Sequence, residues 1–231
     1  MAENGFPENI PDTVFEVKEL EEISEIYEVN AELDYLPDGR EALIIGDPEG
    51  CRPLNHKQGD NPFGFLGTCG LVACEQVLNQ FGLKISEADI TVHAFQRGQC
   101  YVGDAPSMSG GTTVYTQAQI LSDYGVPAHP EVLSDLESLA FMIEQGHGVI
   151  AEVNAGVLWN EPRAWDNGGA NHAIIITGVA RDQKSGEIQG FFINDSGRSS
   201  LIDSARYVDA SAMQSCWLNA GGNCVVTDIV K

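Results

Sequence analysis

The chain has 231 residues and a formal net charge of −22 at pH 7, and 43% of its residues are hydrophobic. This size suits one packed domain with an additional arm, and the longest apolar runs span only a few residues, which argues against membrane insertion. Nucleic acids and anionic membranes bind through basic faces, so the charge argues against both as partners. It is more compatible with a cationic substrate or partner, although the usual meaning of such a charge is solubility.

More than half of this charge lies in the first fifth of the chain. Residues 1–50 contain 15 acidic and 2 basic side chains, a net charge of −13, whereas the remaining 181 residues carry −9. Apolar residues also recur there, more than in a simple solvated tail: Phe15, Val17, Leu20, Ile23, Ile26, Tyr27 and Val29. We predict an acidic arm or linker over residues 1–45, serving as a docking arm, a removable pro-segment or a connection to an upstream domain. The folded domain is predicted over residues 46–231, preceded by a short strand at 42–45.

The best-patterned stretch is residues 67–82, GTCGLVACEQVLNQFG. Leu71, Cys74 and Leu78 recur at helical spacing, which predicts a helix with one apolar face. Thr68 is the expected N-cap, and the glycine at position 82 suits the left-handed conformation just after a helix. The pattern therefore predicts a buried helix that begins at Cys69.

Cys69 consequently lies in the first turn of this helix. The free N–H groups and the positive dipole end found there favour a thiolate, which is the nucleophilic form of cysteine. Gly67 and Gly70 are expected to leave room for a substrate to approach. The alternative interpretation is that Cys69 is a small apolar residue packed at a helix start. Cys74, on the inner face of the helix, is interpreted as such a packing residue.

Further along the chain, helices come first and strands come later. Helices are predicted over residues 86–95, from 112 or 113 to 125, over 134–146 and over 211–218, with Ser134 and Glu137 as a capping box for the third. Strands are predicted over residues 148–154, 172–180, 187–195 and 223–230. Two Gly-containing loops, 97–111 and 154–170, are long enough to be functional and are expected to flank a cleft. This order indicates an α+β domain with an antiparallel sheet.

His172 differs from the other four histidines, which we expect to be exposed or packing residues. It opens the predicted strand HAIIITGVA directly after a Gly-rich loop. A strand end holds a side chain more firmly than a loop does. His172 is therefore the candidate catalytic base.

The predicted hairpin supplies a partner for this base. Its turn centres near Lys184 and Ser185, so antiparallel pairing brings residue 172 opposite about 195–197. Asn194 and Asp195 follow three apolar residues at that point. A Cys nucleophile needs a base within hydrogen-bond reach and a group that orients the base. Cys69, His172 and Asp195 fill these roles, with Asn194 as the alternative third member.

These motifs together resemble the papain-like cysteine peptidases, and most closely the branch typified by bacteriocin leader peptidases, which cleave after double glycine. The resemblance rests on Gln58, GTCG at 67–70, GHGVI at 146–150, NHAIIITG at 171–178 and FINDS at 192–196. It covers about residues 46–231 and leaves the acidic arm out. It implies a papain-like fold in which an N-terminal helical part, with the catalytic Cys at a helix start, packs on an antiparallel sheet that carries the His and the Asp or Asn.

The resemblance also assigns roles. It implies Cys69 as the nucleophile, His172 as the base, Asp195 as its orienting partner and Gln58 as a donor to the oxyanion. Family members usually place this Gln about half a dozen residues before the Cys, whereas Gln58 lies eleven residues before Cys69. We interpret residues 60–66 as a local insertion. The backbone N–H of Cys69 is expected to be a second donor.

We therefore predict a hydrolase that cleaves a peptide or isopeptide bond of a peptide or protein substrate through an acyl-enzyme. Neither a metal nor an organic cofactor is implied. The same triad serves deamidases and transglutaminases, which act on side-chain amides, so these remain alternatives. A catalytically silent papain-like binding module is the alternative from another class. A third possibility, compatible with an enzyme, is a toxin or effector domain excised from a larger secreted protein.

Cysteine usage and the N-terminal residues bear on the compartment. The six Cys show no CxxC pair and no paired Cys/His zinc spacing, so we expect mostly reduced, buried thiols, with a disulfide between Cys51 and Cys100 left open. No positively charged start precedes an apolar run, so no secretory signal is predicted. The expected location is the cytoplasm, or outside the cell as part of a larger exported protein.

Overall fold

The computed structural model describes residues 30–198 and 203–231. The described helices and strands are, in chain order, β1 Ala31–Tyr35, β2 Glu41–Gly46, α2 Pro48–Cys51, η2 Arg52–Leu54, α3 Cys69–Gln80, α4 Glu87–Arg97, η3 Pro106–Met108, α5 Val114–Asp123, β3 Ala128–Val132, α6 Leu136–Glu144, β4 His147–Val153, α7 Ala155–Leu158, η4 Pro162–Ala164, η5 Asp166–Gly168, β5 His172–Arg181, β6 Ile188–Asn194, β7 Arg206–Asp209, α9 Ala210–Met213, the π-helical turn η6 Gln214–Leu218, and β8 Asn223–Val230.

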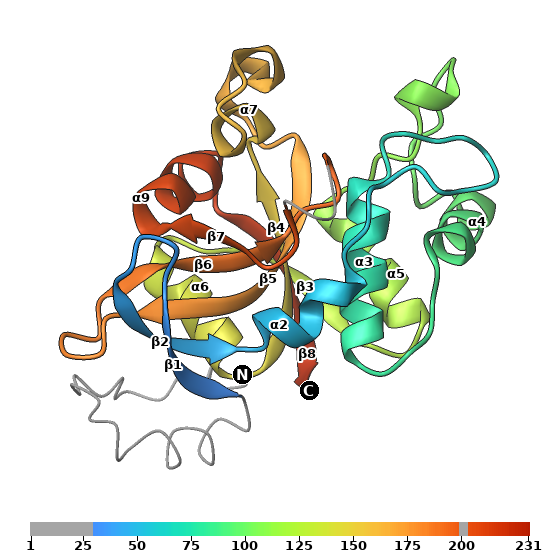
Figure 1. The fold of residues 1–231 in the computed structure, drawn as a ribbon. Helices are drawn as coiled ribbons and strands as arrows, with labels where there is room; N and C mark the ends of the chain where they lie inside the picture. Colours follow the sequence, from blue (N-terminus) through green and yellow to red (C-terminus); the bar gives the residue numbers. More distant parts are fainter. Residues whose placement is uncertain (1–29, 199–202) are drawn as a thin grey trace, which may run out of the picture.

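An antiparallel sheet of eight described strands runs through the molecule (Figure 1). Its strand order is β1-β2-β5-β4-β8-β3, and β6 pairs with β5 and with β7. β5 is the hub, because residues 172–176 pair with β4, residues 178–181 pair with β2, and β6 lies along its other edge. His172, as the first residue of β5, is therefore held at the end of the most extensively paired strand.

Helices cover both faces of this sheet, and alternate residues of the central strands divide between them. Ile150 and Ile175 pack in one apolar cluster with α3 and α5, whereas Val149 and Ile174 pack in another with α6 and Trp217. This alternation follows from the two-residue period of a β-strand. The α+β architecture with an antiparallel sheet is thus confirmed.

The predicted helix at Cys69 is α3, and it is buried along most of its length. Nine consecutive residues are buried, and Leu71, Cys74 and Leu78 have no exposed surface. Burying one such Leu contributes about 1.5–3 kcal/mol, so packing fixes the position of the helix start. The predicted side-chain cap is wrong: Thr68 occupies the N-cap position, but its hydroxyl donates to Glu87.

The first strands correct the predicted boundary at residue 45. β1 and β2 form a hairpin, and β2 pairs with β5 through Leu43 to Gly46. Leu43 and Ile45 belong to the main apolar cluster and are 1% and 2% exposed. Residues 31–45 therefore belong to the folded domain, because β2 pairs with the backbone of β5 and contributes buried side chains to the core. The apolar residues predicted in the arm at positions 15–29 lie outside the described residues.

The other predicted elements are confirmed with small shifts. Ser86 caps α4 and Thr113 caps α5. For α6 the predicted capping box is wrong, because Asp135 has the extended N-cap conformation and accepts the N–H of Ser138 at 2.7 Å. Strands β3 and β7 are new; β3 ends the strand order and contains Pro130, which an edge strand tolerates.

The described part of the chain also answers two questions left by the sequence. All six cysteines are free thiols, so Cys51 and Cys100 are not bridged. Over residues 30–198 and 203–231, no helix is both long and apolar enough to traverse a bilayer.

Candidate active site

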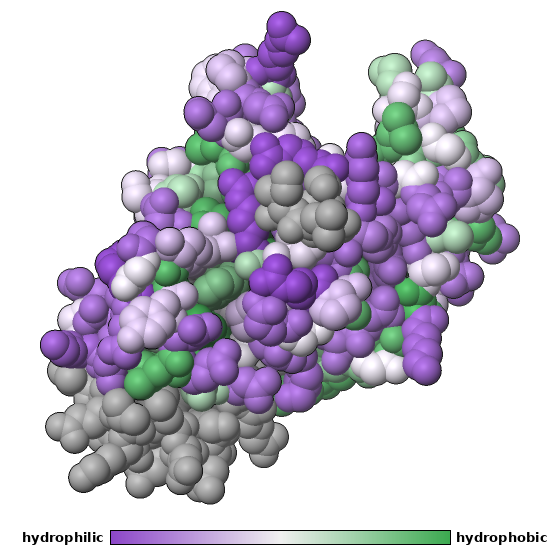
Figure 2. Space-filling model, viewed as in Figure 1, coloured by the Kyte–Doolittle hydropathy of each residue, from purple (hydrophilic) through white to green (hydrophobic). Residues whose placement is uncertain are grey.

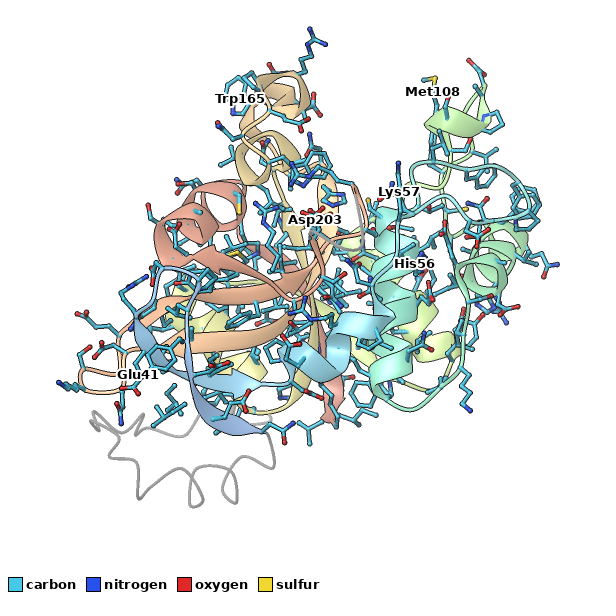
Figure 3. All side chains as sticks on the ribbon, in the orientation of Figure 1. Glu41, His56, Lys57, Met108, Trp165 and Asp203 are labelled. Carbon is cyan, nitrogen blue, oxygen red and sulfur yellow. The ribbon has the colours of Figure 1, made fainter. Side chains whose placement is uncertain are left out.

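A cleft of about 530 Å³ lies where the start of α3 meets the start of β5, and Cys69 and His172 both line it. Both long loops contribute to its wall as predicted, with Met108 from one and Trp159 from the other. In Figure 2 two projections stand on either side of a hollow, and Figure 3 labels Met108 on one projection and Trp165 on the other. The predicted flanking of the cleft by these loops is confirmed.

Cys69 is the first residue of α3 and its side chain is partly exposed. Its backbone N–H has no intrahelical acceptor, as expected at a helix start, and the described residues supply no other. The glycines beside it are closely packed where a side chain would lie, and Gly67 also lines the cleft. A Cβ at Gly67 would lie 2.9 Å from the Ser109 carbonyl oxygen, and one at Gly70 would collide with Thr112.

His172 and Asp195 form a buried pair at the other wall of the cleft. The distance from His172 Nε2 to Asp195 Oδ1 is 2.7 Å, and the two side chains are 5% and 0% exposed. The register of β5 and β6 pairs Ile175 with Asn194, so Asp195 continues from the hairpin towards His172. The hairpin arithmetic from the sequence therefore placed the carboxylate correctly.

Trp159, from the loop predicted over residues 154–170, completes the surroundings of this pair. Its indole N–H donates to Asp195 Oδ2 at 2.7 Å, and its ring centroid lies 5.0 Å from that of His172. The N–H of Gly197 donates to Asp195 Oδ1 at 2.8 Å. A Cβ at Gly197 would lie 2.5 Å from the Trp159 ring and 3.0 Å from the His172 ring. A glycine at this position therefore allows the two rings to close over the carboxylate.

The electrostatics favour an imidazolium next to a carboxylate. Burial lowers the pKa of His172, but hydrogen bonds to Asp195 and to the Cys69 side chain outweigh it and raise the pKa to about 10. Burial raises the pKa of Asp195, but the hydrogen bond and charge of His172, together with Trp159, hold that pKa below its ordinary value. At neutral pH the pair is therefore charged.

Asn194, the alternative third member, does not contact His172. Its side-chain amide donates to the Cys51 carbonyl at 2.8 Å and to Gln76 at 2.9 Å, and its oxygen accepts the N–H of Ala205. Because β-strand side chains alternate, Asn194 points into the interior and its neighbour points towards the base. Of these two side chains, Asp195 is therefore the one that contacts His172.

Gln58 lines the same cleft as Cys69, on the loop that precedes α3. Its side-chain nitrogen donates to the Leu66 carbonyl and its oxygen accepts from Ser196 at 3.2 Å. Its backbone N–H also donates to the Ser196 carbonyl. These bonds tie the loop across the cleft end and leave the second amide hydrogen of Gln58 uncommitted.

The other four histidines have partners elsewhere. His56, His93 and His129 contact carboxylates, and His147 contacts the Thr227 carbonyl. No group of three or more His, Cys, Asp or Glu side chains in the described ranges is arranged to hold a metal ion. Of the five histidines, His172 alone lines the cleft.

The buried helix, the antiparallel sheet and the cleft between them define a papain-like fold of the C39-like peptidase type. The sequence profile of the Peptidase_C39 like family matches residues 52–225. The chain belongs to this family. This confirms the resemblance seen in the sequence motifs.

Individual known proteins are similar to this chain at low sequence identity. An uncharacterized protein of Mycobacterium tuberculosis is 29% identical over 172 residues, which cover 62% of this chain and 72% of the relative, and one of Mycobacterium bovis gives the same figures. A Bacillus anthracis protein described as a C39-like peptidase has a TM-score of 0.53 at 14% identity, covering 78% of this chain and 97% of that chain. A double glycine motif protease from an AMS/PCAT transporter, solved with the leader peptide, has a TM-score of 0.44 at 15% identity, covering 70% and 84%.

Proposed function

We propose that this protein is a cysteine peptidase that hydrolyses a peptide or isopeptide bond through Cys69, His172 and Asp195. The observation that carries the proposal is the 2.7 Å contact between His172 and Asp195 at a cleft that Cys69 also lines. Membership of the Peptidase_C39 like family supports the same chemistry. The substrate is proposed to be a peptide or a protein.

In the proposed first step the Cys69 thiolate attacks the carbonyl carbon of the scissile bond. Negative charge then develops on the carbonyl oxygen. The backbone N–H of Cys69 and the side-chain amide of Gln58 are the proposed donors to this oxygen, supported by the free helix-start N–H and by the position of Gln58 on the cleft wall. One such donor typically contributes about 2.7–4 kcal/mol to the barrier reduction.

His172 is proposed to give its proton to the leaving amine as the C–N bond breaks, which leaves an acyl group on Cys69. Water then attacks this thioester, His172 takes a proton from the water, and the thiolate is released. Asp195 orients the imidazole and stabilises the imidazolium without being protonated itself. These steps need neither a metal nor an organic cofactor.

The test is turnover of synthetic peptides and isopeptides, with products identified by mass spectrometry. Cys69→Ala and His172→Ala are each expected to remove nearly all activity, and the double variant to be scarcely worse, because residues that act as a unit are not additive. Asp195→Ala is expected to cost less, since this residue does not react. Asn194→Ala is the control at the neighbouring position. It is expected to be milder still, because the Asn194 side chain does not contact His172.

The same spectra separate the alternatives. A deamidase converts a side-chain amide into an acid and a transglutaminase joins it to an amine, and in both cases the peptide chain remains intact. A folded protein that binds peptides through the cleft without any chemical turnover would contradict the proposal and favour the silent binding module.

A further inference from the structure

Glu152 is the carboxylate in the wall of the cleft, and the mechanism above does not use it. It is the penultimate residue of β4 and pairs with Ala173, directly after His172 on β5. Ile150, two residues earlier on the same strand, packs with the α3 and α5 cluster. Because alternate strand residues share a face, Glu152 points to the same side, at the end of the sheet where α3 begins.

The polar groups around Glu152 leave acceptors unused. Gln117 on α5 donates from Nε2 to Glu152 Oε1 at 2.6 Å and to the Thr112 hydroxyl at 3.1 Å. Gln117 Oε1 is buried and has no hydrogen-bond partner among the described residues, and those residues supply no donor to Glu152 Oε2. Turning the amide over would set Gln117 Oε1 against the carboxylate, so the observed orientation is the favourable one.

Gln117 and Glu152 lie beside Cys69, the proposed nucleophile. A Cβ on Gly70, the residue after Cys69, would collide with the Thr112 hydroxyl and lie 2.6 Å from Gln117 Nε2. Thr112, Gln117 and Glu152 all line the same cleft as Cys69 and His172. Because Gly70 has no side chain, these groups can pack directly against the first turn of α3.

The charges in the cleft are unbalanced. Among its described lining residues, Glu152 is the one carboxylate and there is no Lys or Arg. Burial raises the pKa of Glu152, against the hydrogen bond from Gln117 and the charge of His172, and this imidazolium is already paired with Asp195 at 2.7 Å. A partly buried carboxylate without its own cation is costly unless a ligand supplies one.

We propose that Glu152 and Gln117 form a cation-binding subsite next to Cys69, which accepts a lysine or arginine side chain close to the scissile bond. This inference rests on the proposed function and names its substrate class: peptides with a basic residue near the cleaved bond. Ammonium and guanidinium groups carry only donors, which match the Oε2 acceptor of Glu152, while Gln117 holds Oε1 of the same carboxylate. The net charge of −22 attracts the same peptides at longer range.

The first experiment needs no turnover. Cys69 of the full chain is labelled with methanethiosulfonate reagents of matched size, one carrying a trimethylammonium group and one a sulfonate, and modification is assigned by mass spectrometry. We expect the cationic reagent to react faster, and Glu152→Gln to reduce the ratio of the two rates roughly tenfold. Glu187→Gln makes the same change in net charge on an exposed hairpin residue and controls for long-range attraction; its ratio should stay at the wild-type value.

The second experiment uses peptide pairs that differ only by lysine or norleucine at each position around the cleavage site. The wild type should prefer lysine at one position by roughly tenfold in kcat/KM, and Glu152→Gln should lose this preference. A thermal transition verifies that the variant folds; if it does not, Glu152→Thr, which suits a strand, replaces it.

The outcomes separate the two proposals. An unchanged labelling ratio in a folded Glu152→Gln protein overturns the subsite, whether or not peptides are cleaved. If Glu152→Gln lowers the ratio of the two labelling rates, Glu187→Gln does not, and no peptide or isopeptide is cleaved, the result supports the cation site and contradicts the peptidase.

Discussion

Asp195 accepts hydrogen bonds from His172, from the Trp159 indole and from the Gly197 N–H while it is completely buried. A carboxylate in such a position needs all of its donors, because an unpaired buried charge is strongly destabilising. The candidate site therefore depends on a tryptophan from a loop as much as on the strand that carries the base.

We predict that Trp159→Phe lowers the free energy of unfolding by about 1.5–3 kcal/mol, the typical contribution of a hydrogen bond to a charged group. Urea denaturation at neutral pH measures this. Trp165→Phe is the matched control, because Trp165 lies on the same projection but is 50% exposed and is expected to change stability little. Equal effects of the two variants would contradict the role assigned to the Trp159 indole.

The pH dependence of stability tests the charge state of His172. Its pKa is about 10 in the folded protein against an ordinary value of 6.5. A raised folded pKa stabilises the fold fully below the unfolded value and loses that contribution as the pH rises through the folded value. We predict that the excess stability of the wild type over His172→Gln, a few kcal/mol by linkage, is largest near pH 6 and shrinks towards pH 10. A constant difference in urea titrations over this range would contradict it.

The positions of the three residues of the proposed triad were predictable because each has a local signal. Cys69 begins a patterned helix, His172 begins a strand, and the hairpin turn sets the distance from that strand to Asp195. Glu152 and Gln117 were not predictable in this way. They come from β4 and α5, and their contact depends on how the helix packs across the sheet.

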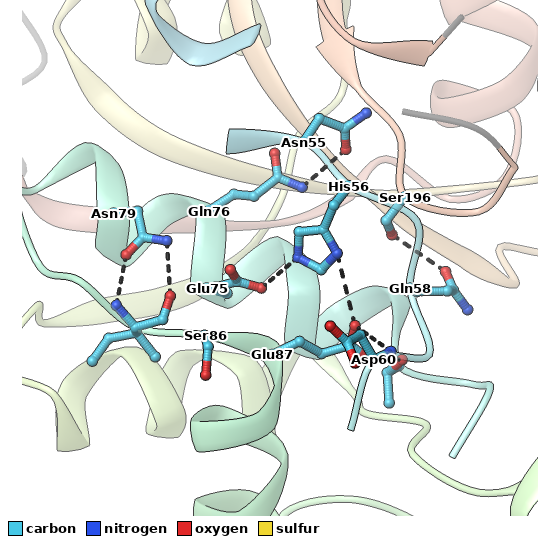
Figure 4. A network of polar contacts seen from close by, with 12 residues as sticks. Asn55, His56, Gln58, Asp60, Glu75, Gln76, Asn79, Ser86, Glu87 and Ser196 are labelled. Carbon is cyan, nitrogen blue, oxygen red and sulfur yellow. Dashed lines mark hydrogen bonds and ion pairs between the residues drawn. The ribbon is translucent and has the colours of Figure 1, made fainter. Parts of the chain in front are cut away.

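At the scale of elements, the loop that carries Gln58 is anchored by α4. The carboxylate of Glu87 accepts the N–H groups of Gly59 and Asp60, at 2.8 and 3.0 Å, and the Thr68 hydroxyl at 2.7 Å. Next to it the imidazole of His56 contacts a second buried carboxylate, on α3, which raises its pKa to about 9 (Figure 4). One helix therefore holds both the candidate oxyanion loop and the residue before Cys69.

We predict that Glu87→Gln lowers the free energy of unfolding by at least about 1.5–3 kcal/mol, because an amide nitrogen then faces backbone donors in place of a carboxylate. Urea denaturation measures the loss. The exposed Glu187→Gln is the control with the same charge change, and it should lie within about 0.5 kcal/mol of the wild type. Indistinguishable stabilities of the two variants would show that the loop is held by other contacts.

The strands that the sequence missed share a physical reason. β1, β3 and β7 have four or five residues each, and their burial patterns do not alternate cleanly. Such strands form because a longer neighbour offers them unpaired hydrogen-bonding groups, so their position depends on tertiary pairing. The long helices and the β5–β6 hairpin carry their own periodicity and turn chemistry, and these were predictable.

At the scale of the whole molecule, the boundary between arm and domain lies before β1. Leu36, between β1 and β2, is 2% exposed and packs with Ala42 and Ala180. The prediction that residues 1–45 lie outside the domain treated their acidic character as a sign of a solvated arm. The sheet instead uses the last third of that segment as β1, at its edge, and β2, between β1 and β5.

Two deletions test this boundary. Removing residues 1–40 strips Leu36 and β1 from the sheet, which should lower the melting temperature by roughly 3–12 °C, from about 1.5–3 kcal/mol for one buried Leu. Removing residues 1–29, the part of the predicted arm outside the described structure, should leave a cooperative transition at the wild-type temperature. Equal melting temperatures of the two deletion variants would show that β1 belongs to the arm and not to the folded domain. A rise in peptidase activity after the shorter deletion would identify an inhibitory pro-segment.

The measurement that tests the nucleophile and its base most directly is alkylation of the six thiols by iodoacetamide across pH, with each modified Cys identified by mass spectrometry. Cys69 should react fastest, because it is partly exposed beside a protonated His172, whereas burial raises the pKa of the other partly exposed thiol, Cys100. His172→Ala should slow Cys69 at neutral pH and leave the rate of Cys100 unchanged. If Cys69 reacts no faster than Cys100, or if His172→Ala leaves its rate unaltered, the two residues do not act as one catalytic unit.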